Sequence, residues 1–245
     1  MNVIEAVGLG KRYGRKWALR DCTLSVPAGH VTGLVGPNGA GKTTLLSMAV
    51  GLVTATTGTV RVVGEPAGSP AARDLVAFVA QDAPLYHNLP VRDMLHVARN
   101  LNLRWDNDRA VTRLAGLGIP LKARVGVLSG GQKAQLALTI ALARRPGLLV
   151  LDEPLAALDP LARHDFMLSV REAVAEDRIS AVFSTHVVAE LEKVADHLIV
   201  LGRGQVLLTG KAADLTAAHE DQSLEKVILT CLRADAAGHE AEVAA

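Results

Sequence analysis

The feature that most constrains this chain of 245 residues is a glycine-rich loop placed directly after an apolar run. The apolar run is Val31–Val35, and a helical pattern follows over residues 42–51. A strand, a loop and a helix in this order predict an α/β fold in which backbone N–H groups surround a phosphate. The loop fits the phosphate-loop pattern G-x-x-x-x-G-K-[ST] and reads Gly36-Pro37-Asn38-Gly39-Ala40-Gly41-Lys42-Thr43-Thr44.

Each residue type in this loop has a physical task. Glycines let the backbone wrap around the phosphates, and the start of the helix adds a positive dipole end of about half a charge. We expect Lys42 to reach the β- and γ-phosphates and the hydroxyl of Thr43 to bind Mg²⁺. The loop therefore predicts a nucleotide, but it does not say which class of protein uses it.

Two adjacent carboxylates follow the apolar strand expected at Leu148–Leu151. An unpaired charge at the end of a buried strand is costly, so we expect Mg²⁺ beside Asp152. Glu153 is then placed to polarise a water in line with the γ-phosphate, as a general base. The alternative is that the pair caps a following helix, and Pro154 with the turn at Asp159 and Pro160 disfavours it.

A second anion-binding segment lies between these motifs and reads Leu128-Ser129-Gly130-Gly131-Gln132. Ser129 is placed to cap a helix that ends near residue 145, before Pro146-Gly147. With this segment ahead of the carboxylate strand, the chain resembles the ATP-binding subunits of bacterial ATP-binding cassette (ABC) transporters. The resemblance extends from Tyr13 to about Gly210.

The resemblance implies a fold and a dimer. It predicts a phosphate-loop ATPase of the ABC type, with a RecA-like core, an antiparallel β subdomain and a helical signature subdomain at about 82–145. We expect one ATP-binding domain over residues 1–217 and a C-terminal helix and tail over 218–245. In the family, Ser129, Gly130, Gly131 and Gln132 would bind the γ-phosphate of ATP held by a second copy, which implies a homodimer.

Four further positions take their roles from the resemblance. Gln81 would contact Mg²⁺ and the attacking water, and His186 would hydrogen-bond the γ-phosphate. Asp159 would link the two sites across the dimer, and Tyr13 would stack on adenine. The chain departs from the family at Ala156, where a serine is frequent, and at Gln135, where an arginine is frequent. Trp17 is expected to be a packing residue.

Bulk properties limit the partners. The net charge of +1 argues against nucleic acid, and Cys22 and Cys231 fit no metal spacing and are expected to be free thiols. No apolar run is long enough to span a bilayer, so any membrane role would come through a permease. We expect the contact with the permease to lie within the segment from Gln81 to Met94. We also expect a cytoplasmic protein that is held peripherally at the inner face of the membrane.

Three alternatives to this interpretation exist. A soluble ABC ATPase of DNA repair would need a long coiled coil before Leu128, and one acting on the ribosome would carry two cassettes. A kinase or GTPase does not explain the 128–132 segment or His186. Within transporters, export of a drug-like or lipid-like molecule is favoured and import stays open, because the permease would hold the substrate.

Periodicity gives a coarse outline of the remaining elements. We expect a continuous helical region from 91 to about 117, a last helix at 224–232 and a frayed tail at 234–245. Strands are expected at 3–7, 23–26, 30–35, 59–63, 75–79, Leu148–Leu151 and 181–184, with a hairpin of 198–201 and 205–209.

Overall fold

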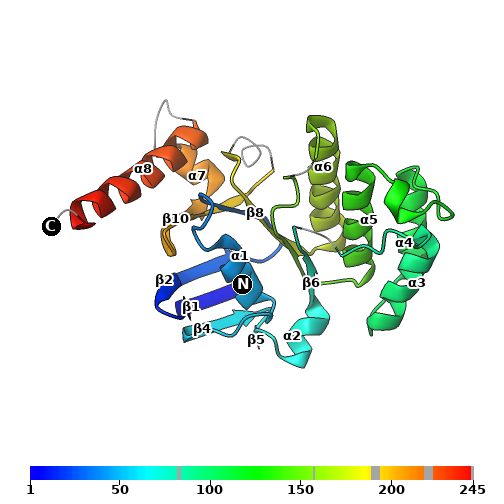
Figure 1. Ribbon diagram of the computed structural model, residues 1–245, viewed down its shortest axis with the longest axis horizontal. Coiled ribbons are helices and arrows are strands. Elements are labelled where there is room, and N and C mark those ends of the chain that lie inside the picture. The colour runs from blue at the N-terminus through cyan, green and yellow to red at the C-terminus, as the bar shows by residue number, and fades with distance from the viewer. Residues whose placement is uncertain (82–83, 157, 189–193, 218–222, 244–245) are drawn as a thin grey trace.

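The computed structural model describes residues 1–81, 84–156, 158–188, 194–217 and 223–243, and for 238–243 the backbone alone. These residues form two β-sheets with helices between and beside them (Figure 1). The expected α/β class with an antiparallel subdomain and a helical part is confirmed.

The smaller sheet is antiparallel and has the strand order β2-β1-β4-β5. Buried and exposed residues alternate along much of β1 and β2, as expected when one face of a sheet is covered. Both strands are much longer than the expected short strands at 3–7 and 23–26. The four strands are β1 (Asn2–Tyr13), β2 (Lys16–Pro27), β4 (Thr57–Val62) and β5 (Glu65–Pro66).

The larger sheet has the strand order β10-β9-β3-β8-β7-β6. The pairs from β9 to β6 are all parallel, and only β10 runs antiparallel, as the second strand of the expected hairpin. Every residue of β3, β7 and β8 is buried, which explains their continuous apolar runs. The strands are β3 (Val31–Val35), β6 (Val76–Val79), β7 (Leu148–Leu151), β8 (Ser180–Thr185), β9 (His197–Gly202) and β10 (Gln205–Lys211).

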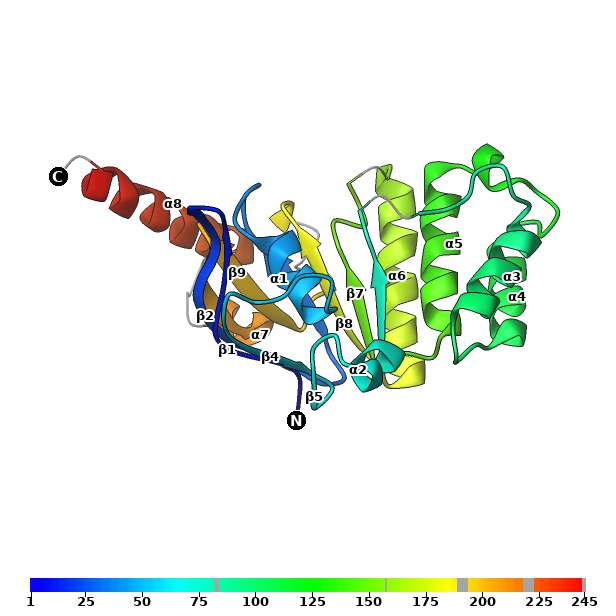
Figure 2. The same cartoon turned by 60° about the horizontal axis from the view of Figure 1, so that its bottom comes forward.

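Helices fill the space between the sheets and cover the far face of the larger one (Figure 2). α1 (Lys42–Ala49) packs between the two sheets, whereas α5 (Gly130–Ala143) and α6 (Pro160–Asp177) cover the other face of the larger sheet. α3 (Val91–Leu101) and α4 (Asn107–Gly116) pack on the outer side of α5. Among the described residues, the remaining helices are α2 (Pro70–Leu75), α7 (Ala212–Ala217), α8 (Leu224–Val243) and a short 3₁₀ helix at Val125–Val127.

Two expectations about helices are wrong. The region from 91 to about 117 is two helices, because the chain is extended at Asn102 and Asp106 and the Asp106 carboxylate caps α4 by accepting from N–H of Arg109 at 3.0 Å. The last helix continues to Val243 instead of fraying after 232. Arg203 anchors it through two hydrogen bonds to Asp235, at 2.7 and 3.0 Å.

Both cysteines are free thiols. Within the described ranges, no helix combines the length and the apolar character needed to cross a membrane.

His197, the first residue of β9, makes the stability of the folded chain sensitive to pH. Its Nδ1 is buried and has no hydrogen-bond partner in the described part of the chain. Burial, with a smaller contribution from nearby His30, lowers the pKa of His197 below its usual value of 6.5. The folded chain therefore binds fewer protons here than the unfolded chain, so its stability falls as the pH drops through about 6.5.

We predict that replacing His197 weakens this pH dependence. The melting temperature of the wild-type chain should fall between about pH 7.5 and pH 5.5, and that of His197→Gln should fall less. His164→Gln, on the exposed face of α6, is the matched control. Equal melting shifts for His197→Gln and wild type would contradict the assignment.

Candidate active site

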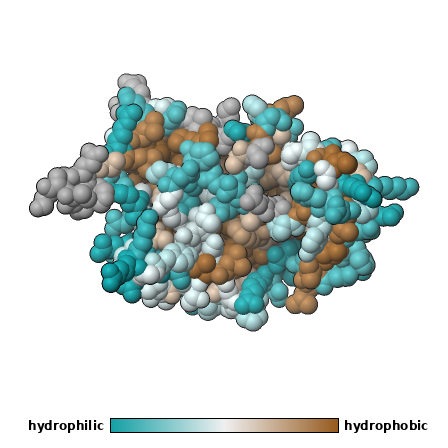
Figure 3. Space-filling view, in the orientation of Figure 1, coloured by the Kyte–Doolittle hydropathy of each residue, from teal (hydrophilic) through white to brown (hydrophobic). Residues whose placement is uncertain are grey.

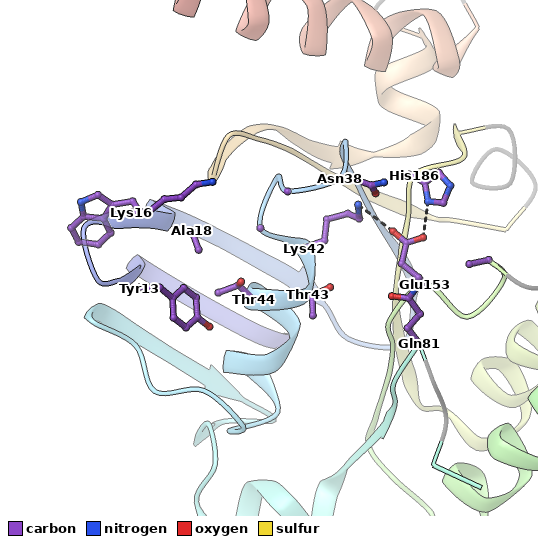
Figure 4. A pocket seen from close by; sticks show the side chains of 14 residues that line it. Tyr13, Lys16, Ala18, Asn38, Lys42, Thr43, Thr44, Gln81, Glu153 and His186 are labelled. Carbon is purple, nitrogen blue, oxygen red and sulfur yellow. Dashed lines mark hydrogen bonds and ion pairs between the residues drawn. The ribbon is translucent and has the colours of Figure 1, made fainter. Parts of the chain in front are cut away.

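The glycine-rich loop after β3 opens into a cleft of about 450 Å³. Figure 4 shows Tyr13 at one end and Gln81, Glu153 and His186 at the other, with Lys42 between. Residues far apart in the sequence therefore meet in one place. The cleft is lined by Tyr13, Lys16, Trp17, Ala18, Asn38, Gly39, Gly41, Lys42, Thr43, Thr44, Gln81, Glu153, Ala156 and His186.

Two glycines of the loop are required by close packing. Gly41 has φ +104°, and a Cβ there would lie 2.7 Å from the carbonyl oxygen of Ala18 in β2. A Cβ on Gly36 would lie 2.2 Å from the carbonyl oxygen of Leu201 in β9. The loop is therefore wedged between the two sheets, where no side chain fits.

Lys42 is buried at the base of the cleft with 6% of its surface exposed. Its Nζ donates to the carbonyl oxygens of Gly36 at 2.8 Å and Pro37 at 3.3 Å. The same ammonium lies 3.1 Å from Oε1 of Glu153. A buried charge is retained only when it is paired and hydrogen-bonded, and these contacts satisfy both conditions.

Glu153 stands between the ammonium and an imidazole. Its Oε2 lies 2.8 Å from Nδ1 of His186, opposite the contact to Lys42 (Figure 4). The residue has φ +47°, which is sparsely populated by residues other than glycine. Such strain persists where the surroundings hold the backbone in place, and it is frequent at functional sites.

Ser184 holds both carboxylate residues, and the sequence analysis missed it. Its Oγ donates to Oδ1 of Asp152 at 2.6 Å and accepts from the backbone N–H of Glu153 at 2.8 Å. The parallel register pairs Leu151 with Phe183, which brings the next residues of both strands together. A hydroxyl ending an apolar strand beside a carboxylate strand was the signal available in the sequence.

The expected magnesium ligands are all oxygen donors, which is the chemistry that Mg²⁺ requires. Asp152 is buried with 3% of its surface exposed and directly precedes Glu153, which lines the cleft. Thr43 and Gln81 line the cleft itself. The donor set therefore fits a magnesium ion that also binds phosphate oxygens and water.

The signature residues do not enter this cleft. Ser129 caps α5 by accepting from N–H of Gln132 at 3.2 Å, and the Gln132 side chain accepts from N–H of Ser129 at 3.0 Å. Gly130 lines a separate cleft of about 250 Å³, which shares Gln81, Glu153 and Ala156 with the first. The start of α5 is thus close to the carboxylate end of the site and outside the phosphate loop.

Asp159 has a local structural partner. It caps α6, where its Oδ1 accepts from N–H of Ala162 at 3.0 Å. It does not line the cleft, whereas Ala156 does. Ala157, which belongs to the same expected segment, lies outside the described residues.

The aromatic end of the cleft contains two rings. Tyr13 ends β1 with 53% of its surface exposed, and the Lys11 ammonium lies 5.1 Å from its ring centre. Trp17 also lines the cleft, and the Arg12 guanidinium lies 5.6 Å from its ring. The expectation that Trp17 only packs is therefore incomplete.

Comparison with known proteins places the chain in a family. Residues 19–156 match the family model described as ABC transporter. A Nod factor export ATP-binding protein I from Burkholderia orbicola (strain AU 1054) is 39% identical over 207 residues, which cover 82% of this chain and 68% of that protein. A sulfate/thiosulfate import ATP-binding protein from Synechococcus elongatus is 33% identical, over 86% of this chain and 63% of that protein.

A solved structure agrees with these sequence matches. The structure of an ATP-binding subunit of an ABC transporter superposes with a TM-score of 0.82 at 26% identity, over 94% of this chain and 99% of that one. The chain belongs to the ABC transporter ATP-binding subunits. It is an ATPase of that family, as the resemblance implied.

We predict that Ser184→Ala impairs the site by releasing both carboxylate residues. Leaving buried partners unpaired costs about 1–3 kcal/mol, and ATP turnover should fall because Glu153 loses its backbone anchor. Ser180→Ala is the matched control, because Ser180 is a buried serine at the other end of β8 that accepts from N–H of Gly29. Turnover and melting temperature would be measured for both. An equal loss of turnover in the two variants would contradict the role of Ser184.

Proposed function

We propose that this chain binds Mg-ATP in the phosphate-loop cleft and, as a pair of copies, hydrolyses it to drive a separately encoded membrane permease. The observation that carries the proposal is the row of Lys42, Glu153 and His186, linked by contacts of 3.1 and 2.8 Å in one cleft. An ammonium, a carboxylate and an imidazole in line suit a γ-phosphate with an attacking water beside it.

The phosphate end of ATP would take the place that Glu153 now occupies against Lys42. The ammonium has three donors, and the loop carbonyls already orient it. Thr43, Gln81 and Asp152 would hold Mg²⁺, which would neutralise charge on the phosphate oxygens. Tyr13 would stack on the adenine at the far end of the cleft.

Glu153 and His186 would then act on the attacking water and the γ-phosphate. Once ATP releases it from Lys42, the Glu153 carboxylate can accept a proton from water as a general base. His186 keeps 47% of its side-chain surface exposed, so its imidazole can turn toward the γ-phosphate. Ser184 keeps Glu153 at the strand end throughout.

The signature segment supports a dimer. Ser129–Gln132 lies outside the cleft and forms a capped helix start with small residues, which would serve as an anion site for a ligand held by another chain. A second copy of the chain, facing the first, would bring its ATP to this segment. The role of Asp159 in linking the two sites belongs to the same proposal.

An apolar groove supports contact with a permease. It has a volume of about 280 Å³, lies between β6, α3 and α5, and includes Leu85, Tyr86 and Met94. Figure 3 shows hydrophobic surface at this end of the molecule. The expected contact from Gln81 to Met94 also includes residues 82 and 83, which lie outside the described residues. A chain held there would sit at the inner face of the membrane.

Direction of transport and domain division stay part of the proposal. We favour export of a drug-like or lipid-like molecule, because several similar proteins are named as export proteins. Import is the alternative, since an import protein is also similar. We also propose a division into an ATP-binding domain over 1–217, with its helical part at about 82–145, and a tail over 218–245.

We predict that Glu153→Gln binds ATP but hydrolyses it about 10²–10⁴ times more slowly, because an amide cannot accept the proton. The variant should accumulate as an ATP-bound dimer in size-exclusion chromatography. Lys42→Ala should lose ATP binding, and Glu65→Gln, exposed on β5, should behave as wild type. Wild-type turnover in Glu153→Gln would refute the general-base role.

The transporter role is tested by capture of partners. The Glu153→Gln variant would be used with Mg-ATP to capture proteins from detergent-solubilised native membranes, and the Lys42→Ala variant would be the matched control. A stoichiometric polytopic membrane protein, captured with Glu153→Gln alone, is the expected result. Ribosomal or DNA-bound material without a membrane protein would favour a soluble ABC ATPase instead.

A further inference from the structure

Three helices meet at a polar chain that begins on α4. Arg113 donates from Nη2 to Oε1 of Gln135 at 2.8 Å and from Nε to Oγ1 of Thr139 at 3.2 Å, both on α5. Nε2 of Gln135 donates in turn to Oγ of Ser169 on α6 at 3.2 Å. Hydrogen bonds therefore run without a break from α4 through α5 to α6.

These hydrogen-bonded side chains lie in the interior, where the helical part packs against α6. Gln135 is 7% exposed, Thr139 1% and Ser169 6%, and Arg113 is half-buried. Burial lowers the pKa of Arg113, an effect that the negative charge of Glu172 opposes. A buried polar network specifies one arrangement when every member is satisfied, and it is costly when one partner is missing.

Arg113 fixes the orientation of the Gln135 amide. A guanidinium has donors and no acceptor, so only the oxygen of the amide can face it. The NH₂ group of Gln135 must then point the other way, toward α6, where Ser169 Oγ accepts. Arg113 on α4 therefore sets the direction of the hydrogen bond between α5 and α6.

The position of this link relates it to the signature. Gln135 lies about one helical turn after Gln132, the last signature residue. At the start of α5, a Cβ on Gly131 would lie 2.9 Å from Cβ of Ala162, so α5 also touches α6 there. The Gly131–Ala162 contact and the Gln135–Ser169 hydrogen bond together set the orientation of the start of α5 relative to α6.

We propose that Arg113 is a positioning residue for the signature: by orienting Gln135 toward Ser169, it sets the direction in which Ser129–Gln132 faces the ATP of a second copy. This inference rests on the proposed function, in which that ATP is bound across the dimer. Arg113 does not line the phosphate-loop cleft, and its described hydrogen bonds go to Gln135 and Thr139, so its effect passes through the α5–α6 link.

The test relocates the guanidinium. Arg113→Gln, Gln135→Arg and the double variant Arg113→Gln/Gln135→Arg would be made in the Glu153→Gln chain. The double variant again places an arginine opposite a glutamine, with the guanidinium now on α5. Dimer formation would be measured against Mg-ATP concentration, together with Mg-ADP affinity of the dilute monomer and melting temperature.

We expect Arg113→Gln to raise the Mg-ATP concentration for half-maximal dimer formation by about tenfold, with Mg-ADP affinity within about twofold of the parent. The double variant should recover most of the loss. Ser169→Ala, which breaks the same link with a small change in volume, should shift dimer formation in the same direction. Arg99→Gln, exposed on α3, should have no effect.

The outcomes separate this inference from the proposed function. If Arg113→Gln and Ser169→Ala form dimers at the same Mg-ATP concentration as the Glu153→Gln parent, the inference is overturned and the proposed function stands. A loss that the relocated guanidinium does not restore also overturns the inference, as does an equal loss of Mg-ADP affinity, because both would mean a general packing role. If the Glu153→Gln parent itself forms no dimer with Mg-ATP, the proposed ATP site across the dimer is wrong, and the inference about Arg113 is wrong with it.

Discussion

The buried ammonium of Lys42 is the interaction on which the rest of the site depends. It lies where the loop after β3 is wedged between β2 and β9, and two loop carbonyls and Glu153 share its charge. Because Gly36 and Gly41 have no side chains, the loop packs closely against both sheets, with the ammonium at the base of the cleft. Both sheets therefore hold the loop that carries this ammonium, and the antiparallel sheet also lines the cleft.

The parallel sheet supplies the groups that face Lys42. The carboxyl ends of its strands lie at one edge, so Glu153 after β7 and His186 after β8 arrive beside the loop after β3. Ser184 converts this proximity into fixed geometry, since a single hydroxyl bonds both the Asp152 carboxylate and the Glu153 amide. The strained φ of Glu153 is held by these contacts, which place its carboxylate between an ammonium and an imidazole.

The helical part is connected to the core mainly through α5. One side of this helix packs in the core with α6, and the other side packs with α3 and α4. The polar chain from Arg113 to Ser169 crosses the same helix, and its first turn is the signature. The orientation of the signature therefore depends on how α5 packs between α4 and α6.

Much of this protein can be predicted from sequence because its motifs are local. The loop, the capped start of α5 and the buried strands each follow from neighbouring residues, so their nature and the family were correctly predicted. The break between α3 and α4 was missed because Asp106 acts as a cap inside a continuous helical pattern.

The remaining features depend on contacts between distant residues. The bonds of Ser184, the place of Trp17 in the cleft and the link from Arg113 to Ser169 join residues far apart in the chain. The sequence by itself determined which chemical groups are present and which local structures they begin. Only the tertiary structure decided which of them meet, because strand register and helix packing set those distances.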